Sequence, residues 1–214
     1  MRADYLRDLD GLIAECGTLH GHICPGQVLG VRMAVLGCLL AGIEDPRGVD
    51  RKRLLVWVEI DRCVTDAVSA VTGVRLGKRS LKFLDYGKVA ATFLNLSENR
   101  AYRIVVKEAS RELADALYPT IGDKKERQLL TYRDADESEL FKVESVEIEL
   151  DDFEKPGRLR KRIICAQCGE GVTDGRDLVD ALNRRICRPC AFEGYYRETD
   201  RRDGASGNLT CTSL

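Results

Sequence analysis

Residues 54–71 read LLVWVEIDRCVTDAVSAV, and this stretch passes directly from a strand-like run into a helix-like one. The run Leu54–Ile60 is short and rich in β-branched residues, as buried strands are. Thr65 is a residue type that caps helices, so we expect a helix that continues to about Val71. Cys63 then lies between the end of the strand and the start of the helix. The stretch predicts a mixed α/β unit.

The sequence on either side extends this unit to residues 1–150. Apolar residues at helical spacing predict a helix from about Asp4 to Cys16, and a second helix from Gln27 to about Ala41 is apolar nearly all round, so we expect it to be buried. The almost wholly apolar surface of this second helix would also suit the interface of a homodimer. Further strands are expected at residues 81–84, 88–96, 102–106 and 142–150, and a further helix at residues 108–117.

The composition excludes several classes of protein. The 214 residues are 44% hydrophobic and 32% charged, which is typical of a globular chain, and the net charge of -1 argues against a dedicated nucleic-acid or anionic-membrane binder. The longest apolar run, residues 28–43, is interrupted by Arg32 and is shorter than the ~20 residues of a membrane span. The charged N-terminus lacks the apolar core of a signal peptide, so we expect a cytoplasmic protein. Nine cysteines in that compartment indicate metal or thiol chemistry rather than disulfides.

Four of these cysteines form two CxxC pairs near the C-terminus. Cys165 and Cys168 are separated by eighteen residues from Cys187 and Cys190. Zinc binds four thiolates at the corners of a tetrahedron, and each pair can fill two corners from one tight turn. We therefore expect a structural zinc ion, in a treble-clef arrangement of knuckle, hairpin and helix. Two redox pairs are the weaker alternative, because neither pair lies in a βαβ context.

Composition also suggests the domain boundaries. Residues 151–162 are predicted to be a linker, in which five of the eight residues 155–162 are Lys or Arg. This basic cluster is either a solvated part of the linker or a local contact with nucleic acid. The zinc module is expected at residues 163–200, followed by a tail at 201–214 that should fray.

A second group of metal-ligand residue types lies in the N-terminal region. The segment HGHICPG contains His20, His22 and Cys24, and these are both histidines of the chain beside one cysteine. The glycines and the proline favour an extended segment, in which alternate residues point to the same side. Two imidazoles and a thiol on one side of a loop indicate a metal or nucleophile site, although a lone histidine is more often an ordinary packed or surface residue.

Three other residues are candidates for the same chemistry. Cys63, at the expected helix N-terminus, would be stabilised as a thiolate there, although a small buried thiol is the alternative. Asp66 follows in the first turn of that helix. Lys78, after Gly77, can bring positive charge to an anionic group, but the segment lacks the residues of a phosphate-binding loop.

The order of these motifs resembles the FmdE family, named for one of the components of formylmethanofuran dehydrogenase. The resemblance covers residues 15–115 and rests on HGHICPG, GVRMA, DRCVTDAVSAVTG, LGK and DYGKVAATF. It implies an α+β core with a mixed β-sheet flanked by helices, and in longer members an appended treble-clef zinc finger. It also implies a metal, often zinc, at positions that match His20, His22, Cys24 and Cys63. Possible neighbours at the matching positions are Asp66, Lys78, Tyr86 and Lys88.

Two functions follow as expectations. In the first, a subset of His20, His22, Cys24 and Cys63 holds zinc or another transition metal in an open site, with Cys63, Asp66 and Lys78 as catalytic candidates. Asp66 would act as a base or would orient a histidine. Such a protein would be accessory to a molybdenum or tungsten oxidoreductase, as the resemblance implies.

In the second, the zinc module docks a partner and the N-terminal thiols bind no metal. A regulator that contacts nucleic acid is a third interpretation and is not expected. The sequence does not decide whether the protein is an enzyme.

Overall fold

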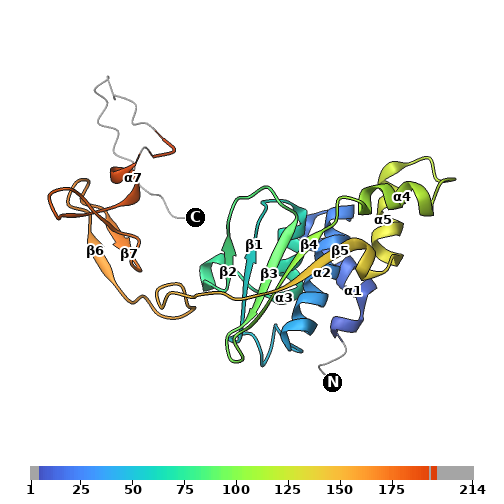
Figure 1. Ribbon diagram of the computed structural model, residues 1–214, viewed down its shortest axis with the longest axis horizontal. Helices are drawn as coiled ribbons and strands as arrows, with labels where there is room; N and C mark the ends of the chain where they lie inside the picture. Colours follow the sequence, from blue (N-terminus) through green and yellow to red (C-terminus); the bar gives the residue numbers. More distant parts are fainter. Residues whose placement is uncertain (1–4, 193, 197–214) are drawn as a thin grey trace, which may run out of the picture. The chain divides into compact units, whose positions relative to one another are not determined.

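The computed structural model describes residues 5–192 and 194–196, and it divides the chain into two compact units (Figure 1). The first unit comprises Met1–Gly157 and the second Arg158–Leu214, so the division falls inside the expected linker. Each unit is described by itself. The expected C-terminal tail, residues 201–214, lies outside the described residues.

A mixed five-stranded sheet forms the centre of the first unit, in the order β2-β1-β3-β4-β5. Strand β1 pairs in parallel with β2, with Val56 opposite Leu81, and all other pairs are antiparallel. The α+β fold class expected from the sequence is therefore confirmed. The strands are β1 Leu54–Val58, β2 Leu81–Phe83, β3 Ala90–Asn95, β4 Arg100–Val106 and β5 Phe141–Val146.

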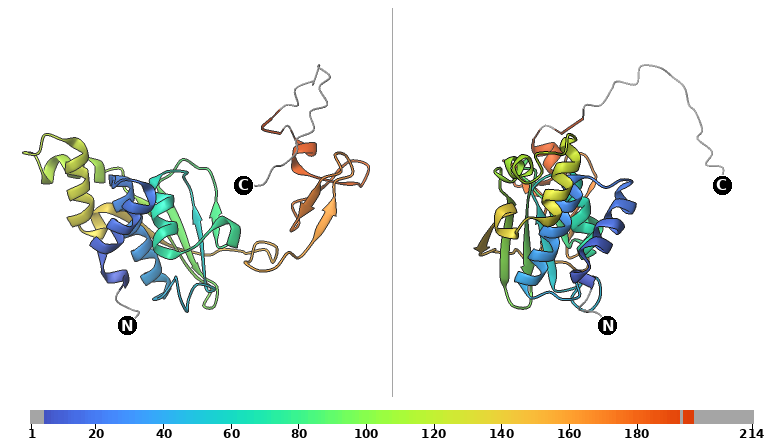
Figure 2. Two further views of the ribbon diagram at one scale, coloured as in Figure 1. Left: turned by 180° about the vertical axis from the view of Figure 1, so that it is seen from behind. Right: turned by 90° about the vertical axis from the view of Figure 1, so that its right-hand side faces the viewer.

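Helices cover one face of this sheet (Figure 2). They are α1 Leu9–His20, α2 Pro25–Ala41, α3 Cys63–Thr72, α4 Ser110–Leu117, α5 Lys124–Asp134 and α6 Glu137–Leu140, with single 3-10 turns η1 Tyr5–Arg7 and η2 Leu76–Lys78. The core lies between the layers, where Val56, Phe93 and Ile104 of the sheet pack with Met33 of α2 and Val68 of α3. No helix in the described part of the chain combines the length and apolar character that crossing a bilayer requires.

Helix α2 is buried at the centre of the unit, as its composition predicts. Val31, Met33 and Ala34 have no exposed surface. Two glycines allow its close approach to neighbouring elements: a Cβ atom at Gly30 would lie 2.7 Å from Ala67 Cβ, and one at Gly37 would lie 2.2 Å from the ring of Phe93. Most of this helix therefore belongs to the core, although Leu39 near its end is exposed.

The main differences from the prediction concern three helices. The first helix begins later than expected, because Asp8 caps it by accepting a hydrogen bond from the Gly11 amide at 2.9 Å. Helix α3 begins two residues before Thr65, whose hydroxyl donates to the carbonyl of Ile60 instead of capping the helix. Helix α5 was not anticipated, because its sequence KKERQLLTYRD is mostly polar.

The second unit is small and has little apolar core. It contains β6 Arg162–Ile164, β7 Gly171–Thr173, β8 Leu178–Val179, β9 Arg185–Ile186 and α7 Arg188–Ala191. Its buried cluster consists of Cys165, Ile186 and Cys187, so two of its three buried members are cysteines. Apolar burial this small is typical of units that a metal ion or a disulfide holds together.

Candidate metal centres

The first centre is built where helix α1 ends and helix α2 begins. His20 is the last residue of α1, and Gly21 ends the helix with φ 91°, a left-handed conformation that favours glycine. Cys24 caps α2 with extended backbone, and Pro25 occupies its first turn. The prediction of an extended segment over HGHICPG is therefore wrong for its first residues. A turn between two helices, rather than strand-like alternation, brings His20 and Cys24 together.

The close packing of α2 and α3 adds a third ligand. Cys63 is the first residue of α3, and one ligand atom from each of His20, Cys24 and Cys63 lies within 4.8 Å of the others. Gly26 leaves room between the thiols, because a Cβ atom there would lie 3.3 Å from Cys63 Cβ and 3.8 Å from Cys24 Sγ. Two sulfurs and an imidazole nitrogen at this spacing are a donor set that zinc accepts.

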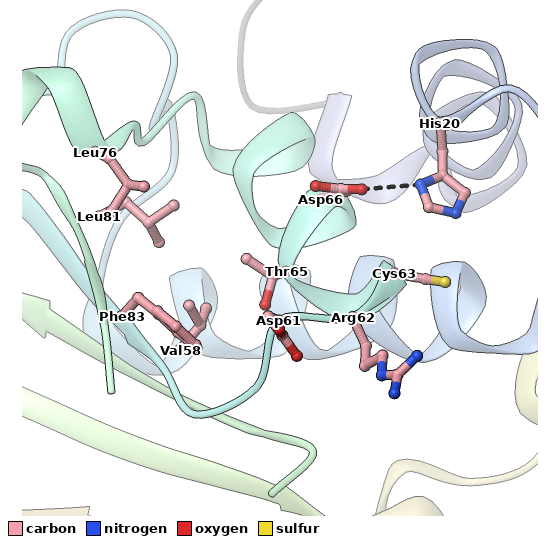
Figure 3. Close-up of a pocket in the computed structure, with 10 residues that line it drawn as sticks. All are labelled: His20, Val58, Asp61, Arg62, Cys63, Thr65, Asp66, Leu76, Leu81 and Phe83. Atoms are coloured by element: carbon pink, nitrogen blue, oxygen red, sulfur yellow. Dashed lines mark hydrogen bonds and ion pairs between the residues drawn. The ribbon is translucent and has the colours of Figure 1, made fainter. Parts of the chain in front are cut away.

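Asp66 fixes the orientation of the histidine. Its Oδ2 atom lies 2.9 Å from Nδ1 of His20, one turn further along α3 than Cys63 (Figure 3). Because Nδ1 is engaged in this bond, Nε2 of His20 is the nitrogen that could bind a metal. In many metal sites a carboxylate sets the tautomer of a ligating histidine in this way.

His22 lies beside this group rather than within it. Its ring centroid is 4.9 Å from that of His20, and its side chain is exposed. Among the described residues, the clustered N-terminal ligands are His20, Cys24 and Cys63. The turn at Gly21 therefore leaves the His22 ring next to that of His20 but outside the cluster of ligand atoms.

The first centre opens into a cavity of about 430 Å³ (Figure 3). His20, Cys63 and Asp66 contribute to its lining, with apolar side chains of β1 and β2 such as Val58 and Phe83. Burial raises the pKa of Cys63, and the neighbouring Cys24 thiol raises it further, so the helix N-terminus alone does not leave a thiolate here. A cation shared by the two sulfurs would favour their ionised forms, which fits the donor set.

The remaining N-terminal candidates do not line this cavity. Lys78 lines a different hollow of the first unit, together with Arg51 and Lys52. Tyr86 and Lys88 approach β1 through their backbone amides, which both donate to the carbonyl of Glu59. The structure therefore joins Cys63 and Asp66 but does not bring Lys78 to them.

Sequence reasoning missed Gln27, which is fully buried in the first turn of α2. Its Nε2 atom donates to the Cys63 carbonyl at 3.2 Å and so holds the start of α3 against α2. The signal was available, since a buried amide in a largely apolar helix requires a polar partner.

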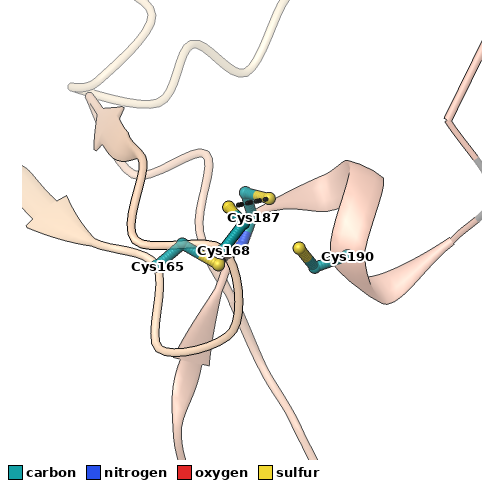
Figure 4. A group of neighbouring side chains, drawn as sticks. All are labelled: Cys165, Cys168, Cys187 and Cys190. Carbon is teal, nitrogen blue, oxygen red and sulfur yellow. Dashed lines mark hydrogen bonds between the residues drawn. The ribbon is translucent and has the colours of Figure 1, made fainter. Parts of the chain in front are cut away.

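The second centre brings the four C-terminal cysteines together (Figure 4). Ligand atoms of all four lie within 4.8 Å of one another, and the sulfurs of Cys168 and Cys187 are 3.8 Å apart. Sulfurs about 2.3 Å from a tetrahedral zinc would be separated by ~3.8 Å, so the group fits such an ion. Gly169 has φ 77°, which the first knuckle requires, and the Cys187 amide donates to Cys165 Sγ at 3.3 Å.

Without a metal, the pKa values of two thiols of this centre are shifted in opposite directions. Backbone amides, first that of Cys168, lower the pKa of Cys165 to about 6. The hydrogen bond with Cys187 and the loss of solvation raise the pKa of Cys190 far above its ordinary value. A bound cation would favour the ionised form of the thiols that ligate it.

Comparisons with known proteins agree with this architecture. Residues 19–149 match the family model described as "FmdE, Molybdenum formylmethanofuran dehydrogenase operon". A protein of Archaeoglobus fulgidus, described as "Probable S-adenosyl-L-methionine-binding protein", is 32% identical over 208 aligned positions that cover 87% of this chain. The chain spans about half, 54%, of the length of that relative.

A solved structure gives the same fold. The crystal structure of an FmdE-like protein of the tungsten formylmethanofuran dehydrogenase type, from Syntrophus aciditrophicus, superposes with a TM-score of 0.59 and 19% identity, covering 92% of this chain and all of that one. Because the family model accounts for more than half of the sequence, the chain belongs to the FmdE family.

Proposed function

We propose that this protein binds a transition metal, zinc in the first instance, at an open site formed by His20, Cys24 and Cys63. The observation that carries the proposal is the convergence of their ligand atoms within 4.8 Å at the edge of a cavity. Three protein ligands beside an accessible hollow leave a coordination position for a substrate or a water molecule, as in catalytic zinc sites. Cys63 would contribute as a ligand.

The chain's own residues would shape the reaction space. When bound, the ion would supply Lewis acidity and would lower the pKa of a coordinated water. Asp66 would hold His20 in one tautomer and would be the nearest candidate base. The apolar walls that Val58 and Phe83 provide would limit water in the cavity. Lys78 would take no direct part, because it lines another hollow.

The C-terminal cysteines would hold a structural zinc ion in a treble-clef module at about residues 163–200. The support is the tetrahedral spacing of Cys168 and Cys187 and the start of α7 at the second pair. Such a module can present a docking surface to a partner protein. We propose a molybdenum or tungsten oxidoreductase as that partner, by analogy with the family description.

A metal count on purified, metal-replete protein tests the open site. The full chain should bind about two ions, the number required if both centres are filled. Cys63→Ser should reduce the count to about one, whereas His22→Ala, the matched control, should leave it unchanged. One ion per chain in the unmutated protein would exclude the open site.

A second candidate function is binding of S-adenosylmethionine in the same cavity. It is favoured by the carboxylates of Asp61 and Asp66, which line a largely apolar hollow and would complement a sulfonium and an ammonium group. The description of the Archaeoglobus relative names this ligand. Equilibrium dialysis with labelled S-adenosylmethionine tests this function. Asp61→Asn is expected to weaken binding. If the unmutated chain does not bind the ligand, this function is excluded.

A further inference from the structure

The first unit contains a second hollow that the metal chemistry does not use. It has a volume of about 550 Å³, and Arg51 and Lys52, from the turn before β1, line it together with Lys78 at the end of η2. A pocket of this volume is large enough for a small organic ligand.

Its charge is unbalanced. No carboxylate is among the described residues that line it. In the same described part of the chain, the side chains of Arg51, Lys52 and Lys78 make neither an ion pair nor a hydrogen bond. Three cations around one hollow repel one another, and an anion between them would turn that repulsion into attraction.

The chain beyond β5 closes one side of this hollow. Arg79 donates to the carbonyl of Phe153, and Nζ of Lys82 donates to the carbonyl of Glu154 at 2.7 Å. These bonds hold the segment 151–157 against η2 and β2, so that Pro156 and Gly157 form part of the lining.

The hollow is separate from the metal centre. The two cavities share no lining residue, although η2 contributes Leu76 to the cavity of Cys63 and Lys78 to the basic hollow. A ligand bound to the three cations would therefore not need the metal.

We propose that this basic hollow binds a small molecule that carries a diphosphate group. Three positive charges match the two to three negative charges of a diphosphate better than the single charge of a carboxylate, and lysine and arginine are the usual partners of phosphate oxygens. The volume leaves room for a further organic group beside the phosphates.

Isothermal titration calorimetry of the full chain with inorganic pyrophosphate tests this proposal, first at low and then at physiological ionic strength. Lys78→Gln and Arg51→Gln should each weaken binding by about tenfold or more, the usual effect of losing one charge-assisted hydrogen bond. Lys125→Gln, an exposed lysine on α5 that lines neither cavity, is the matched control and should leave binding unchanged. Titrations with ADP and orthophosphate then distinguish a diphosphate ligand from free phosphate.

Three results would overturn the proposal. They are no binding of pyrophosphate by the unmutated chain, equal weakening by Lys125→Gln, and loss of binding in Cys63→Ser, which would assign the anion to the metal centre. Since the substituted lysine and arginine side chains are exposed, circular dichroism should show unchanged folding in those variants. Binding that survives Cys63→Ser would support the basic hollow even if the open metal site failed its own test.

Discussion

The bond between Asp66 and His20 gives a quantitative prediction for the metal centre. Replacing Asp66 by asparagine keeps the shape of the side chain and an oxygen that can accept from Nδ1 of His20, but it removes the negative charge. Hydrogen bonds to charged groups contribute ~1.5–3 kcal/mol and neutral ones ~0.5–1.5 kcal/mol, a difference of about 1–1.5 kcal/mol.

Exposure reduces that figure. The Asp66 side chain is 66% exposed and that of His20 is 17% exposed, so solvent screens the charge on the carboxylate side. We therefore take the lower end of the range and expect zinc affinity to fall ~5- to 10-fold, slightly below the usual range for losing an outer partner of a ligating histidine. Asp66→Ala, which also removes the acceptor, should weaken binding further.

Competition with a chromophoric chelator measures this affinity on the full chain. The matched control is Asp61→Asn, which removes the same charge from the same cavity without touching His20. If Asp61→Asn weakens zinc binding as much as Asp66→Asn does, the loss of affinity comes from the general loss of negative charge near the site. If Asp66→Asn leaves the affinity unchanged, the carboxylate does not orient the ligand and the reasoning fails.

Three further predictions concern stability. Gly30→Ala should lower the free energy of unfolding by ~1–3 kcal/mol in denaturant titrations, because the new Cβ would lie 2.8 Å from the backbone oxygen of Val64; Gly122→Ala, with no atom within 4 Å of its Cβ, should have little effect. Burial opposes ionisation of Asp50, but the amides of Asp45 and Glu44 and the Arg53 guanidinium outweigh it and hold the pKa of Asp50 below its ordinary value. The carboxylate therefore stabilises the fold above the unfolded pKa of ~3.9, and Asp50→Asn should cost ~1–3 kcal/mol at neutral pH, a difference that disappears as the pH falls through the folded pKa in an acid titration. Cys168→Ser should unfold the second unit and leave the first folded, as limited proteolysis would show; simultaneous loss of both units would contradict their independence.

The sequence predicted the elements whose patterns are strong. Strand β1, Leu54–Val58, is a short run of apolar residues, as expected for a strand that is buried on both faces of the sheet. Helix α2 is buried because it carries apolar residues on nearly all of its surface. The polar helix α5 could not be predicted in this way. Tertiary contacts hold α5 in place. One of them is made by Arg32 of α2, whose guanidinium donates to the carbonyls of Tyr132 and Ala135 at the C-terminal end of α5.

The candidate sites divide in the same way. The C-terminal cysteines are predictable because each CxxC turn sets its own geometry, and local spacing is enough. The N-terminal group depends on where α1 stops, and the left-handed turn at Gly21 places His20 and not His22 beside the thiols. Cys63 and Lys78 line different cavities because of the path that the chain takes through η2. No local sequence pattern predicts that path.

One packing contact connects the core of the first unit to its candidate metal centre. Helix α2 approaches the backbone of α3 closely at Gly30, and one turn earlier a Cβ atom at Gly26 would lie 3.3 Å from Cys63 Cβ. Cys24, at the start of α2, and Cys63, at the start of α3, are therefore held at their separation by backbone contact between two buried helices. A site held by rigid elements keeps its ligand spacing without a bound ion, which lowers the cost of ordering when the metal enters. The glycines of α2 thus serve the fold and the metal centre through the same close approach.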